Sequence, residues 1–301
     1  MKILVTGGAG FIGKYLVRSL LKNGDSVTIF DNFSNSTKDS VSSLVDIGAK
    51  VIEGDITKLL NIVNAAKDQD RVIHLAAKIS VSESIRNPSE TFQVNVDGTR
   101  NVLAACEKNH IKKLIVASSA AVYGEGFRDV KLTEESKTNP ISPYGESKVR
   151  MEQEIKQFVL RHDIECIILR FFNIYGIGQS SEYAGVITKF MKRIKQERPL
   201  EIFGNGLQTR DFVAIDDVIN SIHNAIQYGK SGTYNIASGK AVTIKELAEQ
   251  MILLSGKKLE MQYTAAKKED INYSHADISL AKKDLGYSPK FELDGIKELL
   301  E

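Results

Sequence analysis

The chain has 301 residues, of which 42% are hydrophobic and 26% are charged, a composition typical of a globular protein with one large domain or a domain plus a smaller lobe. Its 40 basic and 38 acidic residues leave a formal net charge of +2, which gives no electrostatic reason to expect a nucleic-acid partner or an anionic membrane. The apolar run at the N-terminus is too short for a secretory signal, and no stretch has the roughly 18 apolar residues of a membrane span.

Short apolar runs alternate with segments of helical periodicity through the first half of the chain. The expected strands are Lys2–Thr6, Ser26–Phe30, Lys50–Glu53, Arg71–Leu75, Lys113–Ser118 and Glu165–Arg170, and the expected helices include Phe11–Asn23, Glu90–Lys108 and Pro143–His162. Apolar strands that alternate with helices are typical of a parallel sheet covered on both faces. The sequence therefore predicts a doubly wound, Rossmann-like α/β fold.

The pattern loosens after about residue 174. The expected elements there are a helix at about Gly185–Gln196, a strand and turn over 199–206, a helix at Asp216–Tyr228, a strand at Thr233–Ala237, and helices at Thr243–Leu254 and Ile278–Asp284. The prediction is a cofactor-binding domain of residues 1–173 plus about 211–236. A smaller α/β substrate lobe would comprise about 174–210 plus 237–301.

Cys106 and Cys166 lie far apart in the sequence, with no CxxC spacing and no histidine beside them. Two buried structural thiols are therefore expected rather than a metal or redox site. Together with the lack of a signal or membrane span, this favours a cytoplasmic protein.

A glycine cluster separates the first expected strand from the first helix. Residues 6–13 read TGGAGFIG, with Gly7, Gly10 and Gly13 three apart. In this context glycines let the backbone approach a pyrophosphate, and the helix N-terminus supplies N–H donors for it. Asp31 follows Gly10 by 21 residues and suits a carboxylate that accepts hydrogen bonds from a ribose. Since no arginine follows Asp31 to hold a 2′-phosphate, the pattern favours NAD over NADP.

Two more strand ends should line the same crevice. Asp55 is a candidate for the adenine amino group, although a helix N-cap explains it nearly as well. Ala76 and Ala77 leave room for a cofactor to run close to the backbone.

Tyr144 and Lys148 are four residues apart in a helix that Ser142 and Pro143 are expected to begin, so they share one helix face. A free tyrosine has a pKa of about 10 and is a poor base. An adjacent ammonium and a bound pyridinium would favour the phenolate, and a fall of about three pKa units corresponds to roughly 4 kcal/mol. Ser119, after the fifth strand, would share the substrate proton with Tyr144. A surface tyrosine stacked on a lysine and a strand-end hydroxyl bound to local backbone are the alternatives.

Taken together, these motifs resemble the extended short-chain dehydrogenase/reductase family and, within it, the UDP-glucose (UDP-galactose) 4-epimerases. The motifs are TGGAGFIG at 6–13, DNFSNS at 31–36, GDI at 54–56, HLAA at 74–77, SSAAVYG at 118–124, YGESK at 144–148, RFFNIYG at 170–176, RDFVAIDDV at 210–218, YNIASG at 234–239 and DINYSHADIS at 270–279. They span nearly the whole chain.

The resemblance implies a catalytic triad of Ser119, Tyr144 and Lys148 and a support role for Asn95 near the active site. The NAD contacts that it implies are Gly7, Gly10, Phe11, Ile12, Gly13, Asp31, Asn32, Ser34, Asn35, Ser36, Asp55, Ile56, Leu75, Ala76, Ala77, Asn95, Tyr144 and Lys148. The implied contacts to a UDP-sugar substrate are Ser119, Tyr144, Asn173, Val186, Arg210, Lys267, Asp270 and Ser274. Among these, Asn173 and Arg210 would hold the diphosphate, and an ion pair with Asp211 or with another carboxylate is the alternative for Arg210.

The resemblance also implies a homodimer that is built on the helices at 90–108 and 143–162. Apolar residues on more than one face of these helices would cover both the sheet and a partner; they are Val94, Val102, Leu103, Ile155, Phe158 and Val159. Packing within one protomer would give much the same pattern.

Two positions depart from the family pattern. Lys267 stands in the run Lys267-Lys268-Glu269-Asp270, where the family usually has a phosphate-binding arginine. Ser274 stands where some members carry a tyrosine that restricts the sugar pocket, so the N-acetylated UDP-hexosamines become candidate substrates beside UDP-glucose and UDP-galactose.

Three rival functions stay open at this point. A 4,6-dehydratase would usually have an Asp-Glu pair where this chain has Ala120-Ala121. The others are a UDP-glucuronate decarboxylase or epimerase and a non-catalytic, NAD-binding regulator.

Overall fold

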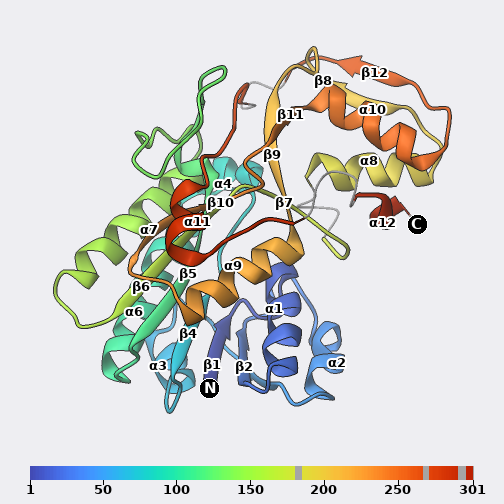
Figure 1. The fold of residues 1–301 in the computed structure, drawn as a ribbon. Helices are drawn as coiled ribbons and strands as arrows, with labels where there is room; N and C mark the ends of the chain where they lie inside the picture. The colour runs from blue at the N-terminus through green and yellow to red at the C-terminus, as the bar shows by residue number, and fades with distance from the viewer. Residues whose placement is uncertain (180–184, 267–270, 291–295, 301) are drawn as a thin grey trace.

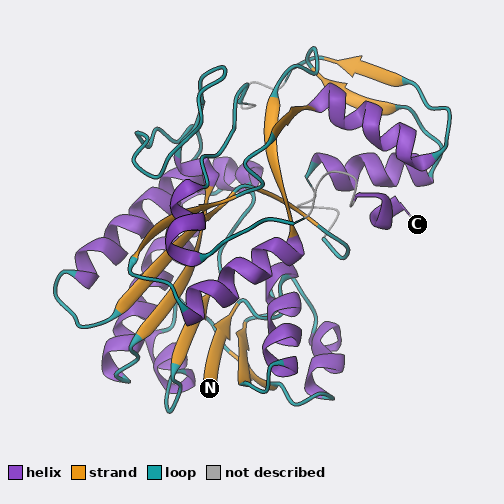
Figure 2. Ribbon diagram, in the orientation of Figure 1, coloured by secondary structure: helices purple, strands orange, loops and turns teal. Residues whose placement is uncertain are grey.

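The computed structural model describes residues 1–179, 185–266, 271–290 and 296–300. Among these, seven parallel strands form the main sheet in the order β10-β6-β5-β4-β1-β2-β3 (Figures 1 and 2). The strands are β1 (Lys2–Thr6), β2 (Ser26–Asp31), β3 (Lys50–Glu53), β4 (Arg71–His74), β5 (Lys113–Ser119), β6 (Glu165–Phe171) and β10 (Gly232–Ile236). The predicted doubly wound fold is confirmed, and the predicted strands differ from these by at most one residue at either end.

Helices cover both faces of this sheet because its central strands are apolar on both sides. In β1, Ile3 and Val5 belong to the core beneath one set of helices, while Leu4 belongs to the core beneath the other. The first set is α1 (Phe11–Lys22), α2 (Ser42–Val45), α9 (Ile215–Gln227) and α11 (Ser279–Leu285), and the second is α3 (Leu59–Ala65), α6 (Gly98–Lys108) and α7 (Pro143–Val159).

A smaller lobe lies at the carboxyl ends of the strands, at the upper right of Figure 1. Its strands are β7 (Asn173–Tyr175), β9 (Thr209–Ala214) and β11 (Ala241–Thr243) in one sheet, and β8 (Leu200–Phe203) and β12 (Met261–Thr264) in another. Helices α8 (Val186–Lys195), α10 (Ile244–Ser255) and α12 (Lys297–Leu300) complete it. A third core, which includes Phe190, Ile202 and Met251, holds the lobe together.

Helix α11 does not belong to the lobe to which the sequence pattern assigned it. Ala281 and Leu285 pack in the core that α1 and α9 form on the main sheet, and the Tyr287 hydroxyl donates to the Ala237 carbonyl at 2.8 Å. The chain therefore returns to the Rossmann domain after it has built most of the lobe.

The helix predicted at Glu90–Lys108 is interrupted. Helices α4 (Val81–Arg86) and α5 (Pro88–Phe92) precede a π-helical segment at Gln93–Asp97, and α6 begins only at Gly98. A π-helical turn inside an α-helix adds a residue to the turn and often marks a functional site. It brings Asn95 into the protein interior, where 1% of the residue is exposed.

Cys106 and Cys166 are free thiols buried in the core on the α6 side of the sheet. Burial raises the pKa of Cys166 to about 12, so it is a structural rather than a nucleophilic thiol. No helix among the described residues is long and apolar enough to cross a membrane.

Candidate active site

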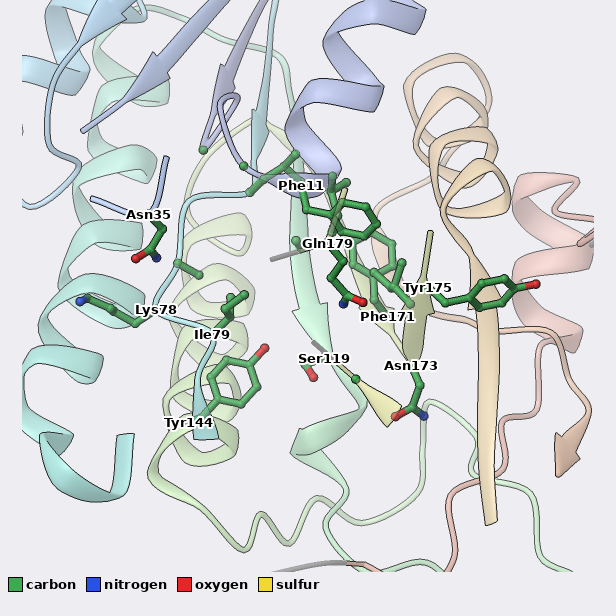
Figure 3. A pocket seen from close by; sticks show the side chains of 18 of the residues that line it. Phe11, Asn35, Lys78, Ile79, Ser119, Tyr144, Phe171, Asn173, Tyr175 and Gln179 are labelled. Atoms are coloured by element: carbon green, nitrogen blue, oxygen red, sulfur yellow. The ribbon is translucent and has the colours of Figure 1, made fainter. Parts of the chain in front are cut away.

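A cavity of about 950 Å³ runs from the glycine turn at β1, past the ends of β5 and α7, to the smaller lobe (Figure 3). It brings together the residues that the sequence predicted for the cofactor and for catalysis. The predicted residues that line it are Gly7, Gly10, Phe11, Ile12, Gly13, Asp31, Asn32, Ser34, Asn35, Ser36, Asp55, Ile56, Leu75, Ala76, Ala77, Ser119, Tyr144, Lys148, Asn173, Val186 and Arg210.

The three glycines of the turn have different steric environments. Gly7 has a φ of +70°, and a Cβ atom there would lie 2.6 Å from the Ala76 nitrogen. At Gly13 a Cβ atom would lie 2.4 Å from the Gly7 oxygen, so only glycine lets α1 pack against the turn. At Gly10 the same atom would meet one neighbour, the Gly7 oxygen at 3.1 Å, and otherwise enters open space. Thus Gly10 is where a pyrophosphate can approach the helix N-terminus, and the turn fits a dinucleotide.

Asp31 braces this turn as well as facing the cavity. Its Oδ2 accepts a hydrogen bond from the Ala9 nitrogen at 3.0 Å, and its Oδ1 accepts one from the Phe33 nitrogen at 2.9 Å. Each oxygen keeps a further lone pair for a ribose hydroxyl. The carboxylate therefore holds the loop and still has the lone pairs that the predicted ribose contact requires.

Asp55 is not the N-cap of α3. Its Oδ1 accepts from the Thr57 nitrogen at 2.8 Å, while the helix is capped at Lys58. Burial opposes ionisation of Asp55, but hydrogen bonds from Thr57 and Asn32 outweigh it and lower its pKa. An ionised carboxylate in the cavity wall is consistent with the predicted contact to an adenine amino group.

Helix α7 presents Tyr144 and Lys148 to the cavity from one face. Ser142 is the N-cap, since its hydroxyl accepts from the Gly145 nitrogen at 3.1 Å, and Pro143 opens the helix as predicted. In Figure 3, the oxygens of Tyr144 and Ser119 point to the same part of the cavity. Burial raises the pKa of Tyr144, and the hydrogen-bonding contact with Ser119 opposes that rise.

Lys148 is 4% exposed, and its Nζ donates to the Ala117 carbonyl of β5 at 2.9 Å. Burial lowers its pKa to about 8, and the negative charge of Glu152 opposes that fall. The ammonium is thus anchored to the strand that carries Ser119. In the protein alone burial of the phenol dominates and raises the pKa of Tyr144, and the predicted fall depends on a bound pyridinium as well as on Lys148.

Asn95 supports the site and does not line the cavity. Its Nδ2 donates to the Lys78 carbonyl and to the Ser147 hydroxyl, both at 2.9 Å, and its Oδ1 accepts from the Lys78 nitrogen at 2.8 Å. Ser147 in turn donates to the Tyr144 carbonyl at 2.7 Å. The side chain thus joins the loop after β4 to the first turn of α7, which agrees with a support role and not with a direct cofactor contact.

On the lobe side, Arg210 and Asp211 of β9 point to opposite faces of the strand. Arg210 lines the cavity, while Asp211 is fully buried and accepts hydrogen bonds from Ser238, Gly239 and Ala276. The carboxylate of Asp211 is therefore directed away from the cavity that Arg210 lines. Asn173 donates to the Asp211 carbonyl at 3.0 Å, which fixes its amide at the cavity edge.

Of the other three predicted substrate contacts, the structure describes only Ser274. Lys267 and Asp270 lie outside the described residues. Ser274 is 3% exposed and is absent from the cavity wall. The preceding residues are fixed by Glu125, whose carboxylate accepts hydrogen bonds at 2.9 Å from the backbone nitrogens of Asn272 and Tyr273.

Several residues of the site were not predicted. Lys78 and Ile79 line the cavity just beyond the Leu75-Ala76-Ala77 run, and Gln179 and Lys189 line it near the lobe. Glu152 was also missed, although its i+4 spacing from Lys148 repeats the spacing of Tyr144 and Lys148. That spacing was the available signal, because it places all three side chains on one helix face.

Comparison with known proteins places these observations in a family. The model of the NAD dependent epimerase/dehydratase family matches residues 3–237. The structure resembles the UDP-glucose 4-epimerase of Thermotoga maritima, solved with UDP-glucose, with a TM-score of 0.93 and 32% identity over 99% of this chain and 96% of that one. It resembles the UDP-N-acetylglucosamine 4-epimerase of Methanobrevibacter ruminantium, solved with UDP-N-acetylmuramic acid, with a TM-score of 0.92 and 33% identity over 99% and 95%.

A third similar structure carries a different sugar. The UDP-glucuronic acid 4-epimerase of Bacillus cereus, solved with UDP-glucuronic acid and NAD, has a TM-score of 0.90 and 32% identity over 99% of this chain and 97% of that one. The three structures share a UDP-linked ligand and differ in the hexose.

Proposed function

Since the chain belongs to the NAD dependent epimerase/dehydratase family, we propose that it is a UDP-sugar 4-epimerase, which inverts the configuration at C4 of a UDP-linked hexose. The observation that carries the proposal is the single cavity that joins the glycine turn, the Ser119 and Tyr144 hydroxyls and the Arg210 side chain. Its extent suits a dinucleotide and a nucleotide sugar lying end to end.

When bound, NAD supplies a nicotinamide ring that takes up and gives back the hydrogen of the C4–H bond with its two electrons. Tyr144 takes the proton of the C4 hydroxyl, and Ser119 holds the same oxygen by a hydrogen bond. Lys148, held at the Ala117 carbonyl, adds a positive charge beside the phenol. When the proton returns to the same oxygen on the inverted carbon, Tyr144 is its donor.

The nucleotide part of the substrate must stay bound while the sugar rotates in the cavity. Arg210 of β9 and Asn173 of β7 line the cavity from strands of the lobe, and Figure 3 shows Asn173 across the cavity from Tyr144. A guanidinium gives paired, planar donors to phosphate oxygens. Binding energy placed on the diphosphate does not favour either epimer, and so it does not oppose the rotation.

The decisive experiment is the interconversion of UDP-glucose and UDP-galactose by the NAD-loaded protein, with no net release of NADH. Tyr144→Phe should lower the rate by at least about 100-fold, since general acid–base catalysis contributes roughly that much. It should leave the folded structure and NAD binding intact. Tyr228→Phe is the matched control, because Tyr228 is 68% exposed and remote from the cavity wall. A Tyr144→Phe variant with the wild-type rate would overturn the proposal.

The preferred hexose is the finer part of the proposal. We expect UDP-glucose and UDP-galactose as substrates, with the N-acetylated pair as a second possibility, because UDP-N-acetylglucosamine and UDP-glucuronic acid epimerases have equally similar structures. Incubation with each UDP sugar, followed by separation of the products, distinguishes epimerisation from 4,6-dehydration and from decarboxylation. Ala120-Ala121 in place of an acidic pair supports epimerisation over dehydration.

A cytoplasmic location and a homodimer stay proposals from the sequence. Val102, Leu103 and Ile155 are buried within the protomer, and Val94, Phe158 and Val159 pack partly buried against the same core. Their pattern is therefore explained by packing on the main sheet. Light scattering of the purified protein tests the dimer.

A further inference from the structure

Glu152 is a buried carboxylate on the catalytic face of α7. It follows Tyr144 by eight residues and Lys148 by four, so the three side chains line one face of the helix. Its side chain is 3% exposed. A buried ionised carboxylate is costly unless it is paired and hydrogen-bonded.

Its partners come from two neighbouring strands. Oε1 accepts from the Ser118 hydroxyl at 2.6 Å and from the Arg170 Nε at 2.9 Å, and Oε2 accepts from the Arg170 Nη2 at 2.6 Å. Ser118 and Arg170 face each other in the register of β5 and β6. One carboxylate therefore fastens α7 to the ends of two strands, and Ser118 is the residue directly before Ser119.

Arg170 is held on its other side as well. Its Nη1 donates to the Tyr123 hydroxyl at 2.8 Å and to the Glu134 carbonyl at 3.0 Å. The guanidinium is thus fixed by the loop after β5 and cannot follow a moving carboxylate. This geometry makes the Glu152 contact a rigid one.

The charges near Lys148 show what Glu152 does electrostatically. The ammonium interacts with Glu152 of α7, with the Ala117 carbonyl of β5 and with the His74 ring of β4. Burial and the charge of Lys148 lower the pKa of His74 to about 3, so the ring is neutral. The cation of Arg170 lies beyond Glu152, and the exposed Lys156 lies 3.9 Å from that carboxylate. Among these charged and titratable groups, Glu152 is the one whose charge favours the charged form of Lys148.

We infer that Glu152 is a positioning residue for proton transfer in the proposed reaction: it holds the Ser119 end of β5 against α7 and keeps Lys148 charged beside Tyr144. The expected effect on catalysis rests on the proposed function, whereas the expected effect on the charge of Lys148 does not. Without the carboxylate, the buried Lys148 gives up its proton more readily and Ser118 and Arg170 lose their shared acceptor.

The test compares the wild type, Glu152→Gln and Glu154→Gln as full chains saturated with NAD. Glu154 is the matched control, since it lies on α7 but is partly exposed and pairs with Arg100. In protein labelled with ¹³C at the lysine side chains, the Lys148 resonance is identified by its loss in Lys148→Met. Its titration midpoint should fall by about 1 pH unit in Glu152→Gln, the lower end of the effect of a nearby opposite charge. It should be unchanged in Glu154→Gln.

A purely structural role would not move this midpoint, so an unchanged midpoint in folded Glu152→Gln overturns the inference. In epimerisation assays, the loss of kcat at alkaline pH should begin at lower pH in Glu152→Gln than in the wild type. If no UDP sugar is epimerised by the wild type, the proposed function fails while the titration still decides the role of Glu152.

Should Glu152→Gln not fold, Ser118→Ala takes its place in the test. This variant removes one hydrogen bond to Glu152 and leaves the Glu152–Arg170 ion pair intact, so no buried charge is left unpaired. It should lower kcat by about fivefold, equivalent to the roughly 1 kcal/mol of one hydrogen bond, and leave KM and NAD affinity near those of the wild type. An unchanged kcat would contradict the inference.

Discussion

Replacement of Gly13 by alanine should separate helix α1 from the glycine turn. The added Cβ would lie 2.4 Å from the Gly7 oxygen, 2.6 Å from the Gly8 Cα and 2.7 Å from the Gly8 carbonyl carbon. All three neighbours are backbone atoms, so no side chain can rotate away. Ordinary contact distances require the helix to shift by about 1 Å, and overpacking of this kind costs roughly 1–3 kcal/mol.

Two measurements follow the effect of this shift. The midpoint of thermal unfolding should fall by about 2–12 °C, given roughly 2–4 °C per kcal/mol in domains of about this size. The dissociation constant for NAD, measured by calorimetry, should rise at least about tenfold, since the helix N–H groups leave their positions around the pyrophosphate.

Gly10→Ala is the matched control within the same turn. Its Cβ would meet only the Gly7 oxygen, at 3.1 Å, so its unfolding midpoint should stay close to that of the wild type. If Gly13→Ala bound NAD and unfolded like the wild type, the assignment of Gly13 to helix packing would be wrong.

Three further expectations concern buried groups. The contribution of His74 to the unfolding free energy should fall by about 2.5 kcal/mol between pH 7 and pH 4.5, because folded His74, with a pKa of about 3, stays neutral while an unfolded histidine takes up a proton below pH 6.5; urea titrations should show that stability depends on pH by that much less in His74→Gln than in the wild type. Asp211→Asn should lower stability by about 2–4 kcal/mol, because an amide nitrogen would face donors from Ser238 and Gly239, and wild-type urea stability in this variant would refute that account. Ser274 is absent from the described cavity wall, so its predicted role in sugar selectivity requires that Ser274→Tyr reduce epimerisation of the N-acetylated UDP sugars relative to UDP-glucose, and unchanged selectivity would exclude that role.

The strands of the main sheet could be predicted from the sequence because each is an apolar run bounded by polar or glycine residues. Among the described lobe strands, β8 lies within the strand and turn predicted over 199–206, whereas β7, β9, β11 and β12 were not predicted. In β7 and β9, Asn173 pairs with Phe212 and Tyr175 with Ala214, so these short segments are strands only because a distant segment lies beside them. The π-helical turn at Asn95 likewise depends on partners in the loop after β4 and in α7.

The cofactor end of the site, like the main sheet, could be predicted because its signal lies in local sequence patterns. The glycine turn and Asp31 act through local backbone geometry, which a spacing reveals. The protonation behaviour of Tyr144 was not predictable, because burial, which no spacing reports, raises its pKa. The Arg170–Glu152 pair was missed because it joins elements that only the folded sheet brings together.

The position of β10 in the sheet also determines when the catalytic half of the protein can finish folding. Strand β6 is complete at Phe171, but its outer partner β10 ends at Ile236, 65 residues later. At a synthesis rate of about 5–20 residues per second, β6 leaves the ribosome roughly 3–13 s before β10. During that interval it is an unpaired, apolar edge that can associate with another nascent chain. The folding yield in the cell should therefore depend on how quickly residues 172–236 are translated.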